Sequence, residues 1–257
     1  MIPRRIYEHV RNHNWFAVAL DFVIVVVGVF IGMQVSNWNE ERHEKHAART
    51  YIERMREDIA ASARSVENAV EYYRAVKTHA LAALEGFEKP QEELGEQFLI
   101  DAYQASQGFY RPGERSTYDE ILSAGAMNTI RNLEVRRRIV IHYNTVEATD
   151  ASLRFRTPYS DNLRRYMPYA VQATAFERCR PATVVDARGF ATVTMRENCD
   201  LGLPSETIAA GITAIRIPEL KLDLVRRLAE LDLNFMLYQR LIERGQALDQ
   251  FLAEAEM

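Results

Sequence analysis

The sequence lacks any segment rich in proline, glycine or serine, and it contains no low-complexity tract. Only 11 of its 257 residues are glycine and 8 are proline, whereas aromatic residues make up 10%. The chain therefore offers no obvious linker between domains, and its aromatic content is sufficient for a hydrophobic core. We expect a mainly α-helical protein without a clear internal boundary, although its length would accommodate one domain or two.

Sequence motifs for catalysis, metal binding and phosphate binding are also missing. The serines have no nucleophile elbow around them, the glycines form no phosphate loop, and no Cys-x-x-Cys pair is present. His43 and His46, with Glu40 one turn earlier, would place metal ligands on one helix face, but a solvated, charged helix has the same composition. We therefore predict no cofactor, no metal site and no enzymatic activity.

The charge of the chain argues against nucleic acid as a partner. The whole sequence has 32 basic and 36 acidic residues. Setting aside Arg4, Arg5, Arg11, Glu8 and Asp21 leaves 29 basic and 34 acidic residues in the rest of the chain. Proteins that bind nucleic acid need a basic surface to contact the phosphates, and this composition does not predict one.

One long apolar run stands out in a chain that is otherwise 26% charged. Residues 22–33 contain no charge, and Trp15 and Trp38 flank them. A helix over 15–38 would be about 34 Å long, which is enough to cross a hydrocarbon core of about 30 Å with an indole at each interface. A buried core helix is one alternative, but the run has no polar stripe. A cleaved signal peptide is the other, but no small-residue cleavage pattern follows.

The charges that flank this run predict its direction in the membrane. Three arginines and one glutamate precede it, whereas acidic and basic residues nearly balance after it. The positive-inside rule then places residues 1–14 in the cytoplasm and residues 39–257 outside.

Polar and small residues in the predicted span suggest contacts with other membrane helices. Asp21 either reaches the headgroup zone or faces a partner, because a carboxylate within the bilayer is costly. Gly28 and Gly32 form a G-x-x-x-G pair that lets two helix backbones approach closely. With Gln34, these residues are our candidate membrane-helix contacts, and they leave open a homo-oligomer formed through the span.

The run from residue 21 to residue 41 resembles the N-terminal signature of a large bacterial family of single-pass membrane proteins. That signature has an acidic residue, a V-V-x-G-I-x-I-A-L core and Q-x-N-N-W-N-E; this chain differs at Gly32 and Ser36, where the family usually has Ala and Asn. A second likeness covers residues 117–130 and 133–143. The resemblance implies a helical domain tethered to the bacterial inner membrane on its periplasmic side, with no assigned activity.

Residues 39–87 are predicted to form one long helix that continues the span. Apolar residues recur there every seven positions, as in a helix with a continuous packing seam. The seam fits either a bundle formed within one chain or a parallel homodimeric coiled coil. Further helices are expected over 91–109, from a capping box at Thr117 to Glu120 through Ala126, and over 133–156. A last helix is expected over 219–255, where it would lie antiparallel along the first.

The only two cysteines, Cys179 and Cys199, flank the one segment with β character. Residues 182–195 are rich in β-branched side chains, with a turn sequence at 186–189, so we predict a small hairpin there. In an oxidising compartment the cysteines are expected to form a disulfide that closes loop 179–199 and stabilises it by roughly 3 kcal/mol. Two free thiols are the alternative.

Aromatic residues and arginines crowd the central third of the chain. Tyrosine with arginine is typical of protein-binding surfaces, but also of helix-bundle cores whose cations reach out to solvent. The candidate partner surface comprises Tyr110, Arg111, Tyr159, Arg164 and Tyr166.

Two functional hypotheses follow from these patterns. The favoured one is a non-enzymatic single-pass protein whose periplasmic helical domain tethers or binds another membrane or envelope protein. The alternative is a helical module that senses a small ligand and acts through a partner membrane protein, because the predicted cytoplasmic part is too short for an output domain. Membrane lipid is a partner in both.

Overall fold

The computed structural model describes residues 15–109, 113–154, 158–187, 189–196 and 198–255. The predicted cytoplasmic segment 1–14 lies outside this part of the chain. The fold is mainly α-helical, with a long apolar N-terminal helix and one small antiparallel hairpin, which confirms the predicted fold class. In chain order the elements are α2 (Trp15–Glu88), η1 (Gln91–Glu93), α3 (Glu96–Ala105), α4 (Ser116–Ser123), η2 (Ala126–Thr129), α5 (Leu133–Leu153), α6 (Pro158–Tyr166), α7 (Tyr169–Cys179), β1 (Ala182–Val185), β2 (Ala191–Thr194), α8 (Ser205–Ile215) and α9 (Pro218–Ala255).

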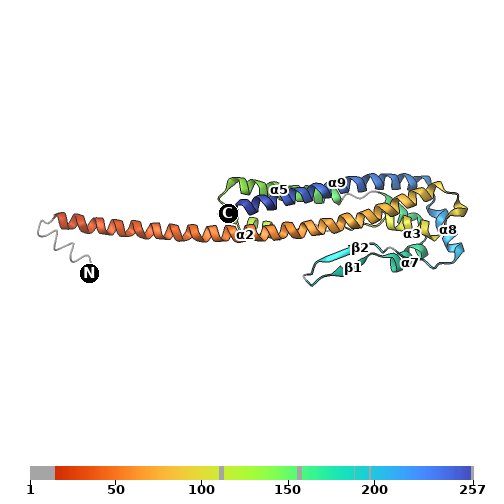
Figure 1. The fold of residues 1–257 in the computed structure, drawn as a ribbon, viewed down its shortest axis with the longest axis horizontal. Helices are drawn as coiled ribbons and strands as arrows, with labels where there is room; N and C mark the ends of the chain where they lie inside the picture. The colour runs from red at the N-terminus through yellow and green to blue at the C-terminus, as the bar shows by residue number, and fades with distance from the viewer. Residues whose placement is uncertain (1–14, 110–112, 155–157, 188, 197, 256–257) are drawn as a thin grey trace.

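Helix α2 runs without interruption from the apolar segment into the bundle (Figure 1). Its 74 residues span about 110 Å, because each helical residue rises about 1.5 Å. No proline interrupts the helix, and Pro90 follows two residues after its end. The N-terminal third projects away from the other helices, whereas the rest packs against them.

The heptad seam of α2 is buried within its own chain. Its first set of positions is nine-tenths or more buried at every member: Ile52, Ile59, Val66, Tyr73, Ala80 and Phe87. Helices α9, α3 and α4 of the same chain pack on α2. The seam therefore forms an intramolecular bundle, which was one of the two arrangements that the heptads predicted.

Helix α9 lies antiparallel along α2, and α5 packs on α9 as a third helix (Figure 1). Its buried stripe includes Leu224, Leu231, Tyr238 and Leu252. The far end of the bundle is wider, because α3, α6, α7 and α8 pack there around a core that they share with the ends of α2 and α9.

Close packing of α2 against α3 depends on a glycine. A Cβ at Gly86 would overlap the Phe98 ring, so any larger residue would push the two helices apart. The Phe98 ring meets Phe87 edge to face, with ring centroids 5.3 Å apart.

The predicted capping box at the start of α4 is wrong. Thr117 lies inside the helix, and its N–H donates to the Asp58 carboxylate on α2 over 3.0 Å. Glu120 does not turn back to the helix start, because Arg54 donates to it from α2 over 3.0 Å. Two α2 side chains therefore hold α4, and the sequence near α4 could not reveal them.

Candidate binding site at the disulfide hairpin

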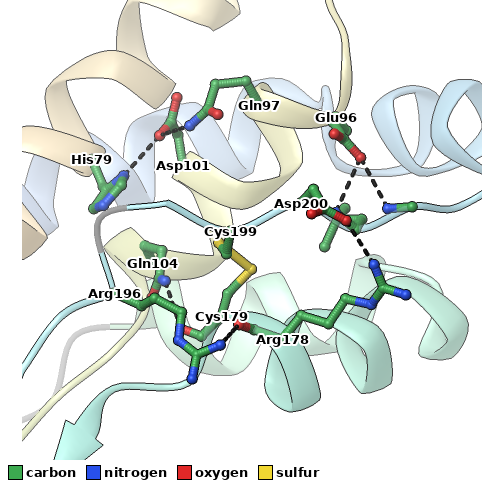
Figure 2. The surroundings of a disulfide bond; sticks show 12 residues. His79, Glu96, Gln97, Asp101, Gln104, Arg178, Cys179, Arg196, Cys199 and Asp200 are labelled. Carbon is green, nitrogen blue, oxygen red and sulfur yellow. Dashed lines mark hydrogen bonds and ion pairs between the residues drawn. A yellow bond between two sulfur atoms is a disulfide. The ribbon is translucent and has the colours of Figure 1, made fainter.

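The base of the hairpin is fixed by the disulfide between Cys179 and Cys199, whose Cα atoms are 5.3 Å apart (Figure 2). The predicted pairing and the predicted hairpin are both present. The buried Gln104 side chain on α3 donates to the Cys179 carbonyl over 2.7 Å. The disulfide is therefore attached to the bundle core as well as closing the loop.

Charged side chains secure the segment that follows the disulfide (Figure 2). The Glu96 carboxylate accepts hydrogen bonds from the backbone N–H groups of Leu201 and Gly202, at 3.1 and 3.3 Å. Arg178 forms an ion pair of 2.6 Å with Asp200. The two ends of the hairpin loop are therefore both attached to the bundle by these contacts.

The tip of the hairpin closes at Gly189, which has a positive φ of 80°. Its N–H donates to the Asp186 carbonyl over 3.0 Å, and the Asp186 N–H donates to the Phe190 carbonyl over 2.9 Å. Glycine adopts this left-handed conformation without steric cost, so the turn sequence specifies the register of the two strands.

The outer edge of β2 is covered by Asn68 of α2. The Asn68 amide donates to the Val193 carbonyl over 3.0 Å, and its oxygen accepts from the Val193 N–H over 3.0 Å. The side chain therefore satisfies both outward backbone groups of Val193. Asn68 is itself buried, with 8% of its surface exposed.

The outer edge of β1 is open in the described residues. Thr183 lies opposite Val193, whose polar groups point away from β1, so the N–H and C=O groups of Thr183 also point outward. The same alternation turns the backbone groups of Val185 outward. All four residues of β1 are exposed, including Val184 at 66% and Val185 at 61%. An edge with unpaired backbone groups and apolar side chains is a template for strand addition.

A groove of about 1010 Å³ lies between the hairpin tip, α2 and the segment before α4. Its lining is mixed and includes side chains of both charges: Ser62, Arg64, Ser65, Glu114, Arg115 and Asp119, with Asp186 and Phe190 from the hairpin. Ser62 connects α2 to the segment before α4, because its hydroxyl accepts a hydrogen bond from the Glu114 N–H over 2.8 Å.

The two arginines in the groove differ in their surroundings. Arg115 forms ion pairs with Asp119 at 3.0 Å and with Glu147 at 3.6 Å. The hydrogen bond that Arg115 donates to Asp119 raises the pKa of its guanidinium above its usual value. Arg64 is exposed and lies 6.0 Å from the centre of the Phe190 ring.

The predicted partner surface is only partly on the surface. Tyr159 is fully buried and its hydroxyl donates to the Ala102 carbonyl over 2.9 Å, so its assignment to a partner surface is wrong. Burial also raises the pKa of this phenol. Arg164 and Tyr166 are exposed at the end of α6, whereas Tyr110 and Arg111 lie outside the described residues.

The predicted membrane contacts lie on the projecting part of α2. Gly28, Gly32 and Gln34 are exposed, and Asp21 is half-buried. A Cβ at either glycine would meet nothing within 4 Å. Helix contacts at these positions remain predictions.

Among the residues that the structure describes, one helix is long and apolar enough to cross a membrane. It lies near the N-terminus and contains Trp15 and Trp38, and its most apolar window has a mean hydropathy of 2.4 and no buried residues. Within the described residues no group of three or more potential ligands is placed to hold a metal ion.

No family model, no curated protein and no solved structure matches this chain. The resemblance of its N-terminal run to a bacterial membrane family therefore remains a prediction.

Proposed function

We propose that this protein is a membrane-anchored tether that binds an extended segment of another envelope protein at the open edge of β1. The span 15–38 would hold it in a bacterial inner membrane, with the bundle in the periplasm. The observation that carries the proposal is the asymmetry of the hairpin, in which Asn68 covers one edge and the other edge presents exposed valines.

The rigidity of the anchor supports this mechanism. Because α2 continues from the apolar segment into the bundle, no hinge separates the span from the hairpin support. A strand added to β1 would gain backbone hydrogen bonds from Thr183 and Val185, and its apolar side chains would pack on Val184. The partner would be held at a constant height above the bilayer.

A second copy of this chain does not fit the open edge. The strands run roughly along α2 (Figure 1), so antiparallel pairing of two β1 strands would invert one molecule relative to the other. Two copies anchored in the same bilayer in the same direction cannot adopt that arrangement. The expected occupant is therefore a β-branched, extended segment of a different protein.

The test places a photo-crosslinking amino acid at Val184 in cells and locates the crosslinked peptide by mass spectrometry. Thr183→Pro is the matched variant, because it removes an outward N–H and leaves the β1–β2 hydrogen bonds intact. We expect a discrete adduct at an extended apolar segment, reduced about tenfold by Thr183→Pro.

Leu222 on α9 is 69% exposed and serves as the control position for the crosslinker. An adduct of equal yield at Leu222, or an adduct unaffected by Thr183→Pro in a variant that keeps its helicity and disulfide, would contradict strand addition.

A second candidate function, ligand sensing, is favoured by the groove of about 1010 Å³. Its serines and mixed charges suit a small zwitterionic or polar molecule. An Arg64→Gln variant would distinguish the two functions, because it should weaken binding of such a ligand while leaving the crosslink from Val184 unchanged.

A further inference from the structure

The outer side of α7 carries large exposed side chains. The buried residues of this helix follow one another at intervals of four and pack into the core at the far end of the bundle. Tyr169 and Phe176 are seven positions apart, so they lie on one side of the helix, about two turns from each other. Tyr169 is 84% exposed and Phe176 is 61% exposed. Two aromatic rings on this helix are therefore in contact with solvent.

The end of α6 extends this surface. The Gln172 side chain on α7 donates to the Arg164 carbonyl over 2.8 Å and to the Met167 carbonyl over 2.6 Å, so the end of α6 lies against the first turn of α7. We call the combined exposed surface the α7 face. It comprises Arg164, Arg165, Tyr166, Tyr169, Phe176 and Arg180. Tyrosine and arginine are the residues that contribute most often to the binding energy of protein interfaces.

The charge of this region is opposite to that of the domain. Residues 158–196, which include α6, α7 and the hairpin, contain six basic and three acidic residues, whereas residues 39–257 contain 29 basic and 34 acidic residues. Arg178 pairs with Asp200 at 2.6 Å. The three arginines of the α7 face have no acidic partner among the described residues. They are therefore available to the carboxylates of a binding partner.

Two acidic residues adjoin the α7 face without pairing with its arginines. Asp161 lies one turn before the arginines of α6, and Glu177 follows Phe176 on α7. Both are exposed, and neither forms an ion pair within the described part of the chain. Each lowers the positive potential of the face, so removing one of them should strengthen the binding of an anionic partner.

The α7 face continues into the open edge of β1. Pro181 is the one residue between Arg180 and the strand. Because Asn68 of α2 bonds to the other edge of the hairpin, the open edge points away from α2. The exposed side of α7 also points away from α2, since its buried side packs on a core that includes the end of α2. Figure 1 shows α7 and the hairpin following one another on the side of α2 opposite α9.

The height of the α7 face excludes the lipid headgroups of the proposed membrane as its ligand. Ala80 and Phe87 of α2 belong to the same core as α7. They lie about 63 and 74 Å beyond Trp38 along the helix axis, because each residue rises about 1.5 Å. The headgroup layer is only roughly 5 to 7 Å thick. The anionic groups that reach this face therefore belong to a partner that extends away from the bilayer.

We propose that the α7 face binds an acidic continuation of the extended segment that adds to β1, with its carboxylates at Arg165 and Arg180 and its apolar side chains on Tyr169 and Phe176. The proposal rests on the proposed function, because the strand at β1 brings the segment to this face. Arginine binds carboxylates through two parallel hydrogen bonds, and aromatic rings provide large apolar contact areas. The partner segment thus combines a β-branched run with neighbouring Asp or Glu residues.

The test places the photo-crosslinking amino acid at Phe176 or at Val184 of the full chain in cells. The two positions are at most about 22 Å apart along the chain, which an extended segment spans with about seven residues. We expect both probes to capture the same protein, at sites no more than about ten residues apart. The peptide captured at Phe176 should contain Asp or Glu.

Charge variants of opposite expected sign test the acidic character of the segment. Arg165→Gln and Arg180→Gln should each lower the yield of the Phe176 adduct about twofold to threefold, and Glu177→Gln should raise it by a similar factor, as for exposed ion pairs. Arg240→Gln is the control and should change nothing. Arg240 is an exposed arginine without an ion-pair partner among the described residues, and it lies on α9, on the other side of α2.

The outcomes separate this inference from the proposed function. An adduct at Val184 without one at Phe176, or the capture of unrelated proteins at the two positions, would overturn the inference and leave strand addition intact. Equal yields in the arginine, glutamate and control variants would overturn the acidic character of the segment. The absence of an adduct at Val184 would overturn strand addition, and this inference with it.

Discussion

Among the described residues, the buried imidazole of His142 makes the stability of the bundle depend on pH in the acidic range. It lies between α2, α5 and α9 with 7% of its surface exposed. Burial, with a smaller contribution from Arg244, lowers the pKa of His142 to about 4. Its Nδ1 atom has no hydrogen-bond partner within the structure. The folded protein therefore holds this imidazole in its neutral form.

We predict that the free energy of unfolding falls as the pH decreases from about 6.5 to about 4. The unfolded chain binds a proton on His142 near its usual pKa of about 6.5, whereas the folded chain does not until about pH 4, so acid favours unfolding in that window. The loss should approach about 3 kcal/mol at the lower limit. Urea unfolding of the detergent-solubilised chain at several pH values measures it.

The variant His142→Gln provides the control for this prediction. It removes the titrating group with little change in volume, so the slope of stability against pH between 6.5 and 4.5 should flatten. The same slope in the variant would assign the acid sensitivity to other groups.

A buried ion pair at the centre of the bundle shows that charged side chains are buried there together with a partner of opposite charge. Arg227 and Glu230 on α9 are 3.0 Å apart, with side-chain exposures of 8% and 13%. Arg227 also donates to the Gln107 carbonyl over 2.9 Å. Charges this deeply buried require such partners, because an unpaired charge in the core is strongly destabilising.

At the scale of elements, the attachment of β2 to α2 decides which edge of the hairpin is available. A two-stranded hairpin is marginally stable by itself. Here it is held at its base by the disulfide and at its middle by Asn68. Because Asn68 bonds to the edge of β2, the edge of β1 is the one that stays open in the described residues.

We predict that Asn68→Leu releases the β2 edge and lowers the free energy of unfolding by about 1 to 3 kcal/mol, since the Val193 N–H and C=O groups lose their partner. Hydrogen–deuterium exchange should show faster exchange of the Val193 amide and unchanged exchange in α9.

Asn68→Asp is the matched variant, because it keeps the acceptor for the Val193 N–H and loses the donor to the carbonyl. Its exchange rate should lie between those of the native chain and Asn68→Leu. Identical rates in all three proteins would show that Asn68 does not hold the strand.

At the scale of the whole molecule, the protein consists of a projecting apolar helix and a bundle that covers its own seam. The core positions of α2 beyond residue 50 are buried against helices of the same chain. The bundle therefore does not need a second copy to complete its core.

We predict that residues 39–257, expressed without the apolar segment, form a helical monomer that needs no detergent. Analytical ultracentrifugation and circular dichroism check this prediction. The full chain should require detergent, because residues 22–33 expose apolar side chains on every side. A dimer of the truncated chain would instead support the coiled-coil arrangement.

The elements governed by local pattern were predictable from the sequence. The apolar run, the heptads of α2 and the turn at 186–189 each determine backbone conformation through neighbours within a few residues, and the helix, its buried seam and the hairpin are all present. The cysteine pairing was predictable because only two cysteines exist.

Contacts between residues far apart in the chain were decided by tertiary packing alone. Asn68 bonds to a strand residue 125 positions later, and Asp58 accepts a hydrogen bond at the start of a helix 59 positions later. Tyr159 is buried, although the Tyr- and Arg-rich composition of its segment is typical of a binding surface. The type of residue determines which hydrogen-bond donors and acceptors a side chain has. The packing of α2 against the other elements decides which partners lie close enough to bond to it. For that reason the long apolar helix and the bundle follow from the order of residues, whereas the open edge of β1 follows only from the folded chain.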